Sequence, residues 1–100
     1  MFVYNITTKV DRDIINDWLK WQKEEHIPEI IATELFTGYK FFQLLEQDDS
    51  EDATYVLQYF SETEENYKRY IDEFAPGLGE KAFKKWGDQF IAFRSLMRVV

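Results

Sequence analysis

Several residue types that build chemical sites are scarce in this 100-residue chain, which has no cysteine, one histidine, four glycines and two prolines. Without cysteine there is no disulfide, no thiolate metal site and no cysteine nucleophile. The single histidine, His26, leaves carboxylates to complete a metal site, and no two of them have a telling spacing. The acidic segment 48–52 lacks the glycine and terminal glutamate spacing of an EF-hand loop, so we expect a solvated turn. We therefore expect no metal and no other cofactor.

Long apolar runs and an excess of basic residues are missing as well. No segment approaches the roughly 18 apolar residues of a transmembrane helix. The N-terminus has no basic region followed by an apolar run, so we expect no signal peptide and a cytoplasmic protein. The 12 Lys and Arg against 19 Asp and Glu give a net charge of −7. Phosphate groups would repel such a chain, so we expect neither nucleic acid nor a membrane as a partner.

Large aromatic side chains are abundant by contrast, with nine Phe, six Tyr and three Trp. The length is that of one domain, so residues 1–100 are expected to form a single unit. A domain of this size buries roughly 60–70% of the surface of its unfolded chain. The aromatic content therefore predicts either a firm core or more apolar surface than one small domain can cover.

The order of the predicted elements is β-α-β-β-α-(α)-β. Runs of aromatic and β-branched residues predict strands over residues 2–7, 39–46, 53–60 and 89–99. Helical spacing of apolar residues predicts a helix from Asp11 to about His26, a second that ends at Phe74, and a short third over 78–86. This order is typical of a ferredoxin-like α+β domain with a four-stranded antiparallel sheet.

Local signals support these boundaries. Asp11 is a good helix N-cap, and Pro28 is expected to end the first helix because its ring disfavours a helical conformation in the preceding residue. Residues 29–32 are candidates for one further turn. Ser61 and Glu64 have the spacing of a capping box. Gly87 is suited to close the third helix.

The predicted strands carry apolar residues on both faces. Neighbouring side chains in a strand point to opposite faces, so a sheet covered by helices on one side should alternate apolar and polar residues. The last strand instead sets Phe90, Ala92 and Leu96 against Ile91, Phe93 and Met97. Monomers rarely expose a large apolar patch, so we predict a homodimer that packs sheet against sheet. The alternative is that interspersed tyrosines and polar residues keep the outer face wet enough for a monomer.

The first predicted helix carries a polar cluster on its apolar side. At about 100° per residue, Trp18 and Trp21 share one arc with Gln22, Glu25 and His26. In a cleft against the sheet, the tryptophans would form an apolar wall and His26, with a near-neutral pKa, would act as a general acid or base or as a donor to a ligand. The alternative is that His26 is a helix C-terminal residue whose charge the helix dipole favours.

Four motifs occur together along the chain: FVYNIT at 2–7, WxxWx4HIPE at 18–29, ATYxxQY at 53–59 and GDxFxAFR at 87–94. The combination resembles domain-of-unknown-function family 4286, a family of small bacterial proteins, over nearly the whole chain. The resemblance implies the dimeric α+β barrel superfamily, in which two ferredoxin-like subunits pack sheet to sheet. That layout is similar to antibiotic-biosynthesis-type monooxygenases, haem-degrading monooxygenases, muconolactone isomerases and stress-responsive barrel proteins. Because these do unrelated things, the fold transfers no function.

Asn5 is the polar centre of the first predicted strand. Haem-degrading members of the superfamily use an asparagine on this strand beside a tryptophan and a haem-ligating histidine. Here His26 lies in the first helix instead of the second half of the chain, so the resemblance does not extend to haem chemistry. The alternative for Asn5 is a satisfied amide that hydrogen-bonds across the dimer.

Arg94 lies in the last predicted strand among apolar residues. A buried arginine needs an anionic partner. It either binds an anionic substrate or pairs with an acidic side chain, for which Glu46 and Glu25 are candidates.

We therefore predict a small homodimeric ligand-binding or accessory protein with an apolar-aromatic pocket that accepts a small hydrophobic ligand. The alternative is a cofactor-independent monooxygenase or isomerase that acts on a small aromatic substrate. The candidate catalytic residues are His26 and Asn5, and the candidate ligand-binding residues are Trp18, Trp21, Gln22, Tyr59 and Arg94. An enclosed void of ~300 Å³ or more that His26 reaches would favour the enzyme.

Overall fold

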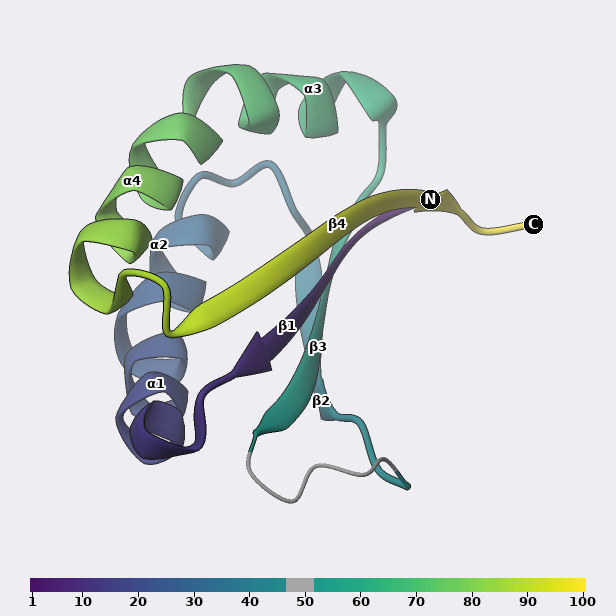
Figure 1. The fold of residues 1–100 in the computed structure, drawn as a ribbon. Helices are drawn as coiled ribbons and strands as arrows, with labels where there is room; N and C mark the ends of the chain where they lie inside the picture. The colour runs from purple at the N-terminus through teal and green to yellow at the C-terminus, as the bar shows by residue number, and fades with distance from the viewer. Residues whose placement is uncertain (47–51) are drawn as a thin grey trace.

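The computed structural model describes residues 1–46 and 52–100, which form a four-stranded sheet covered by helices (Figure 1). The strand order is β2-β3-β1-β4, and every neighbouring pair is antiparallel. The strands are β1 (Phe2–Val10), β2 (Gly38–Gln43), β3 (Ala53–Ser61) and β4 (Phe90–Arg98). The predicted ferredoxin-like α+β class is therefore confirmed. The first strand and the third are longer than expected because they pair along their whole length, from Phe2 opposite Ser61 to Val10 opposite Ala53.

The first helical segment continues past the proline that was expected to end it. Asp11 caps its start as predicted, since its carboxylate accepts a hydrogen bond of 2.9 Å from the Asp13 N–H. A proline inside a helix lacks one N–H and its ring clashes with the carbonyl four residues back. Just before Pro28, however, the Ile27 N–H donates to the carbonyl of Gln22, five residues back, so a wide π turn accommodates the ring. The segment comprises a 3₁₀ turn (Arg12–Ile14), α1 (Ile15–Trp21), a π turn (Gln22–His26) and α2 (Ile27–Ile31).

The second helix begins with a different cap from the one predicted. The Thr63 hydroxyl accepts a hydrogen bond of 3.1 Å from the Asn66 N–H and caps α3 (Glu64–Glu73). Ser61 does not cap this helix because it is still paired with Phe2 as the last residue of β3. Its hydroxyl instead donates to the Thr63 carbonyl at 2.7 Å.

The third helix is longer than expected. Residues 75–77 do not form a break between two helices, because α4 (Ala75–Trp86) begins directly after Phe74. Pro76 lies in the first turn of α4, where a backbone N–H has no partner within the helix. The change of direction between α3 and α4 is visible in Figure 1. Gly87 ends α4 as predicted, with a φ of 60° that favours glycine.

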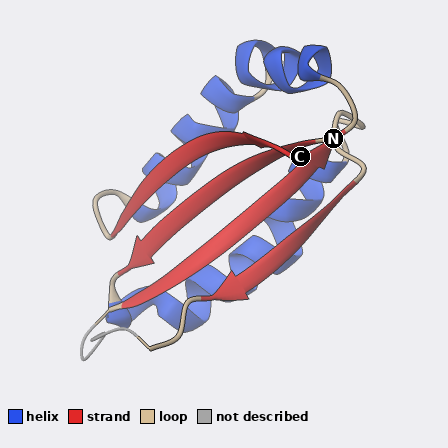
Figure 2. Cartoon of the chain, turned by 90° about the vertical axis from the view of Figure 1, so that its right-hand side faces the viewer, coloured by secondary structure: helices blue, strands red, loops and turns tan. Residues whose placement is uncertain are grey.

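The described helices lie on one face of the sheet, which Figure 2 shows from its uncovered side. On the covered face, one core cluster contains Tyr4, Tyr59 and Tyr70, and a second contains Trp18 and Trp86. These clusters bury most of the large aromatic side chains of β1, β3 and the helices. The core therefore lies between the helices and the sheet.

The uncovered face is polar at its centre and apolar along β4. Alternation along each strand places Asn5 and Gln58 on this face, where the Gln58 Nε2–H donates to Asn5 Oδ1 at 3.3 Å. Along β4, at the edge of the sheet, Ile91 and Phe93 are 58% and 68% exposed.

The second strand is shorter than predicted. It was expected to reach residue 46, but β2 ends at Gln43, so the last apolar residues of the predicted strand lie outside the sheet.

In the part of the chain that the structure describes, no helix combines the length and apolar character that crossing a bilayer requires. The cytoplasmic location expected from the sequence stays a prediction. Most of the predicted acidic turn over 48–52 lies outside the described residues, since residues 48–51 are not described. Its last member, Asp52, accepts a hydrogen bond of 3.4 Å from the Arg12 N–H.

Candidate functional site

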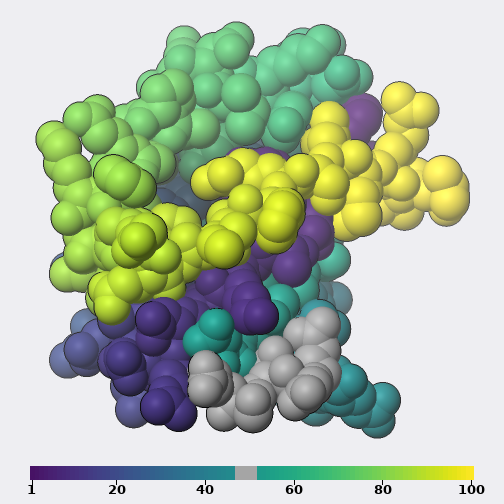
Figure 3. Space-filling model, in the orientation of Figure 1, coloured from purple at the N-terminus to yellow at the C-terminus, as the bar shows by residue number. Residues whose placement is uncertain are grey.

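A cavity of about 360 Å³ lies between the helices and the covered face of the sheet. Volumes of this order are typical of small-molecule pockets. Figure 3 shows the surface hollowed between α4, in green, and β4, in yellow. Its lining is mainly aromatic and aliphatic, with a few polar groups, and includes Tyr4, Thr8, Trp18, Trp21, Gln22, His26, Ala82, Phe90 and Arg94.

The π turn determines which polar side chains of the first helical segment face this cavity. Gln22 and His26, its first and last residues, both line the cavity. Glu25 was predicted to share their arc but is exposed, because the wide turn adds one residue to the helical repeat. Such turns inside α-helices occur frequently at functional sites. The sequence motif around Pro28 thus has a local consequence, since the turn that admits the proline also shapes the cavity wall.

His26 is a packed, neutral side chain. Its ring stacks on Trp21, with ring centroids 4.5 Å apart and an interplanar angle of 20°. The pKa of His26 is lowered from 6.5 to about 4, mainly by burial; the charge of Glu29 raises it, and the charges of Lys81 and Arg94 add to the lowering. The pKa is therefore below the near-neutral value expected from the sequence. His26 is also not a helix C-terminal residue, because α2 continues to Ile31.

Arg94 brings a positive charge to the cavity. It lies on β4 opposite Ile6 and is exposed, so the expectation of a buried arginine was wrong for this edge strand. Burial raises the pKa of Tyr4, while the charge of Arg94 and a hydrogen bond from it act in the opposite direction. Within residues 1–46 and 52–100, Arg94 forms no salt bridge, so neither predicted carboxylate partner, Glu46 nor Glu25, pairs with it.

Gln22 is a buried polar residue of the cavity wall, as is Thr8. Gln22 is 6% exposed, and its Oε1 has no hydrogen-bond partner among the described residues. A buried acceptor without a donor costs about 1–3 kcal/mol. We therefore expect Gln22, without a partner in the cavity, to lower the stability of the protein relative to a similarly shaped apolar residue.

We accordingly expect the Gln22→Met substitution to raise the free energy of unfolding by about 1 kcal/mol, because it keeps the length of the side chain and removes the unpaired amide. Urea denaturation at neutral pH measures this change. The matched control is Gln43→Met, at an exposed position, with a change within about 0.5 kcal/mol. A loss of more than 1 kcal/mol in Gln22→Met would contradict the assignment of an unsatisfied amide.

The sheet separates the two predicted catalytic residues. Asn5 lies on the uncovered face, where its Nδ2–H donates to Thr7 Oγ1 at 3.2 Å, while His26 lines the cavity on the covered face. Tyr59 lies on the covered face but is fully buried against Phe36, outside the cavity lining. Of the predicted set, the structure therefore brings together Trp18, Trp21, Gln22, His26 and Arg94. The roles proposed for these residues stay predictions.

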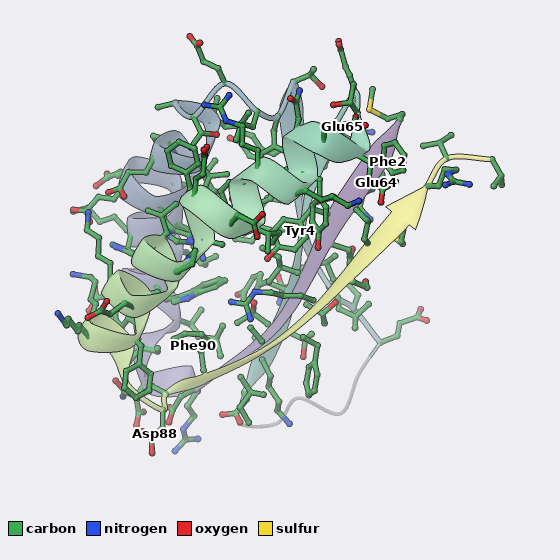
Figure 4. All side chains as sticks on the ribbon, turned by 90° about the horizontal axis from the view of Figure 1, so that it is seen from above. Phe2, Tyr4, Glu64, Glu65, Asp88 and Phe90 are labelled. Atoms are coloured by element: carbon green, nitrogen blue, oxygen red, sulfur yellow. The ribbon has the colours of Figure 1, made fainter. Side chains whose placement is uncertain are left out.

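The sequence reasoning missed most of the apolar lining and all three lining residues that carry a hydroxyl, Tyr4, Thr8 and Tyr70. Figure 4 shows Tyr4 and Phe90 on the same side of the sheet as α3 and α4. The period-two alternation that places Asn5 on one face of β1 places Tyr4 and Thr8 on the other. That signal was available once the cavity-facing side of the strand was known.

Among residues 1–46 and 52–100, no group of three or more His, Asp or Glu side chains gathers as metal ligands would.

One known family matches the sequence over its full length. The pattern of the family described as "Domain of unknown function (DUF4286)" covers residues 1–100. The chain belongs to the DUF4286 family. A comparison with curated proteins found no match for this DUF4286 chain.

Solved structures share the fold of this DUF4286 chain at low sequence identity. A dimeric ferredoxin-like protein from an uncultured marine organism is 13% identical, with a TM-score of 0.70, and the match covers 99% of this chain and 94% of that one. An ethyl tert-butyl ether D family protein from Bacillus halodurans is 13% identical, with a TM-score of 0.68 and full coverage of both chains. A candidate antibiotic biosynthesis monooxygenase from Bacillus cereus is 20% identical, with a TM-score of 0.61 and coverage of 98% and 91%. At these identities the likeness establishes the ferredoxin-like fold of this chain and carries no function.

Proposed function

We propose that this DUF4286 protein binds a small, largely aromatic molecule in the cavity between its helices and its sheet. The observation that carries the proposal is the cavity itself, whose volume of about 360 Å³ suits a small molecule. Two indole rings, Trp18 and Trp21, contribute to its wall, and aromatic rings favour aromatic ligands through edge and stacking contacts. The cavity opens to the surface between α4 and β4, which gives a ligand a route in (Figure 3).

Indole is a suitable neutral probe. At ten times its Kd, a ligand that binds the folded state stabilises it by about 1.4 kcal/mol, which raises the Tm of a domain of this size by about 6–11 °C. In the Ala92→Leu variant, which places a larger side chain in the cavity lining, we expect this shift to disappear. The control Ala32→Leu changes an exposed residue at the end of α2 and should keep the full shift. An equal shift in Ala92→Leu would contradict binding in this cavity.

We also propose that the protein is a homodimer that pairs through the uncovered sheet face. The support is the exposed apolar edge of that face, with Ile91 and Phe93 more than half exposed, where a monomer would leave them in water. Asn5 and Gln58 at its centre would supply hydrogen bonds across the interface. Structural neighbours are described as dimeric, which agrees with the proposal.

Sedimentation at micromolar concentration tests the dimer. We expect a mass near twice the chain mass of 12.1 kDa for the wild type. The Val56→Glu variant places a carboxylate on the uncovered face and should sediment as a monomer, because two copies would bury unpaired charges. Glu65→Gln, on the exposed side of α3, is the control and should stay dimeric. A monomeric wild type would overturn this part of the proposal.

A cofactor-independent monooxygenase or isomerase is the second candidate. It is favoured by the neutral imidazole of His26, which lines a cavity of about 360 Å³, above the ~300 Å³ expected of an enzyme site. The cavity is open at the surface, so it does not meet the expectation of an enclosed void. The enzyme is also disfavoured by Asn5, which lies on the opposite face of the sheet from His26. Turnover of an aromatic substrate by the wild type, lost in His26→Phe without loss of indole binding, would select the enzyme.

A further inference from the structure

The charge of the cavity wall differs in sign from that of the protein. The chain carries a net charge of −7. Yet among the described residues no Asp or Glu lines the cavity, while Arg94 does. The other cation near this wall, Lys81, is paired with Glu29 at 2.6 Å, and that pair lies outside the lining. The wall therefore has a local positive charge in an acidic protein.

We infer that the cavity selects aromatic molecules that carry a carboxylate, with the carboxylate held by Arg94 at the mouth and the ring among the apolar side chains. This inference rests on the proposed ligand-binding role and adds the chemical class of the ligand.

The guanidinium of Arg94 has donors to spare for such a contact. It presents five N–H groups in a planar fork that matches a carboxylate. Within the described part of the chain no carboxylate forms an ion pair with this guanidinium. The polar group that interacts with it is the hydroxyl of Tyr4. Arg94 is exposed, so water solvates its charge when no ligand is bound. The residue therefore does not require the permanent anionic partner that a buried arginine requires.

The remaining polar groups of the wall fit one charged end and one apolar end. His26 is neutral at pH 7, so it does not compete with Arg94 for an anion. Ile6, which is paired with Arg94, and Ala92 supply aliphatic surface beside it, and Leu57 continues this surface on β3. The ligand class that matches both parts is a ring with one carboxylate, because a second charge would be buried without a partner.

The test compares benzoate with benzamide, which has the same shape without the charge, by isothermal titration calorimetry at pH 7. A charge-assisted bidentate pair is worth enough to change Kd by tenfold or more. We expect benzoate to bind the wild type at least tenfold more tightly than benzamide. Arg94→Met should reduce this ratio to about one by weakening the binding of benzoate.

Arg98→Met is the matched control. Arg98 lies on β4, four residues after Arg94 and on the same face of the sheet. Its guanidinium carbon lies over the Phe2 ring, 5.6 Å from the ring centroid, and Arg98 does not line the cavity. It should keep the wild-type preference for benzoate.

Three outcomes would overturn the inference. Equal affinity of the wild type for the two probes would refute the carboxylate preference and leave the ligand-binding role standing. A preference that survives in Arg94→Met would assign it to another residue. Failure of both probes and of indole to bind would refute the ligand-binding role together with the inference.

Discussion

Replacing Trp18 by alanine is expected to lower the free energy of unfolding by about 3–5 kcal/mol. Trp18 is 2% exposed and packs against Tyr55 and Phe41, with ring centroids 5.4 and 6.0 Å away. Because the ring also borders the cavity, its removal enlarges an existing void that the rigid sheet cannot fill. Urea denaturation at neutral pH measures the loss.

The control for this prediction is Phe83→Ala. Phe83 is also an aromatic residue on a helix, but it is 63% exposed on α4. Its removal should change the free energy of unfolding by no more than about 0.5 kcal/mol. If Trp18→Ala cost less than about 1 kcal/mol, the helix-to-sheet packing described above would be wrong.

The free energy of unfolding should also fall by about 3 kcal/mol between pH 6.5 and pH 4 through His26 alone. The folded-state pKa of His26 is lowered from 6.5 to about 4, so over this interval the unfolded chain binds a proton that the folded chain does not. Each pKa unit corresponds to ~1.4 kcal/mol. The stabilisation is therefore present above pH 6.5 and is lost as the pH falls towards 4.

The difference between wild type and His26→Phe isolates this effect from the carboxylates that titrate in the same range. Phenylalanine can keep the stack on Trp21 but takes up no proton. The groups that face His26 from its own helix and its neighbours, Glu29, Lys81 and Arg94, are present in both proteins. Parallel stability curves from pH 7 to pH 4 would show that the imidazole is not buried as described.

The sequence was sufficient for the fold because its signals are local and consistent. Gly87 closes α4 and Asp11 opens the first helix as their side chains predict. Pro28 misled the prediction because its effect depends on tertiary packing. Ile27 and Ile30, on either side of it, are almost completely buried, so the core favours a continued helix and the π turn makes this possible.

The candidate site was predictable where it lay on one helix. Trp18, Gln22 and His26 share a side of the first helical segment, which periodicity alone reveals. Asn5 could not be placed in this way, because the face of a strand that meets the helices depends on the assembled sheet. Tyr59 lies on the covered face, but it packs against Phe36 away from the cavity, and strand periodicity does not reveal which part of that face the cavity reaches. A shift of one residue in the pairing of a strand moves each of its side chains from the face that bears the cavity to the uncovered face, or the reverse.

The central claim is that the covered face of the sheet holds a ligand and the uncovered face does not. An amide NMR titration of the wild type with indole tests it directly. The account predicts that chemical shifts change at Gln22, His26 and Ala92, which line the cavity. Changes confined to Asn5 and Gln58, on the uncovered face, would contradict it.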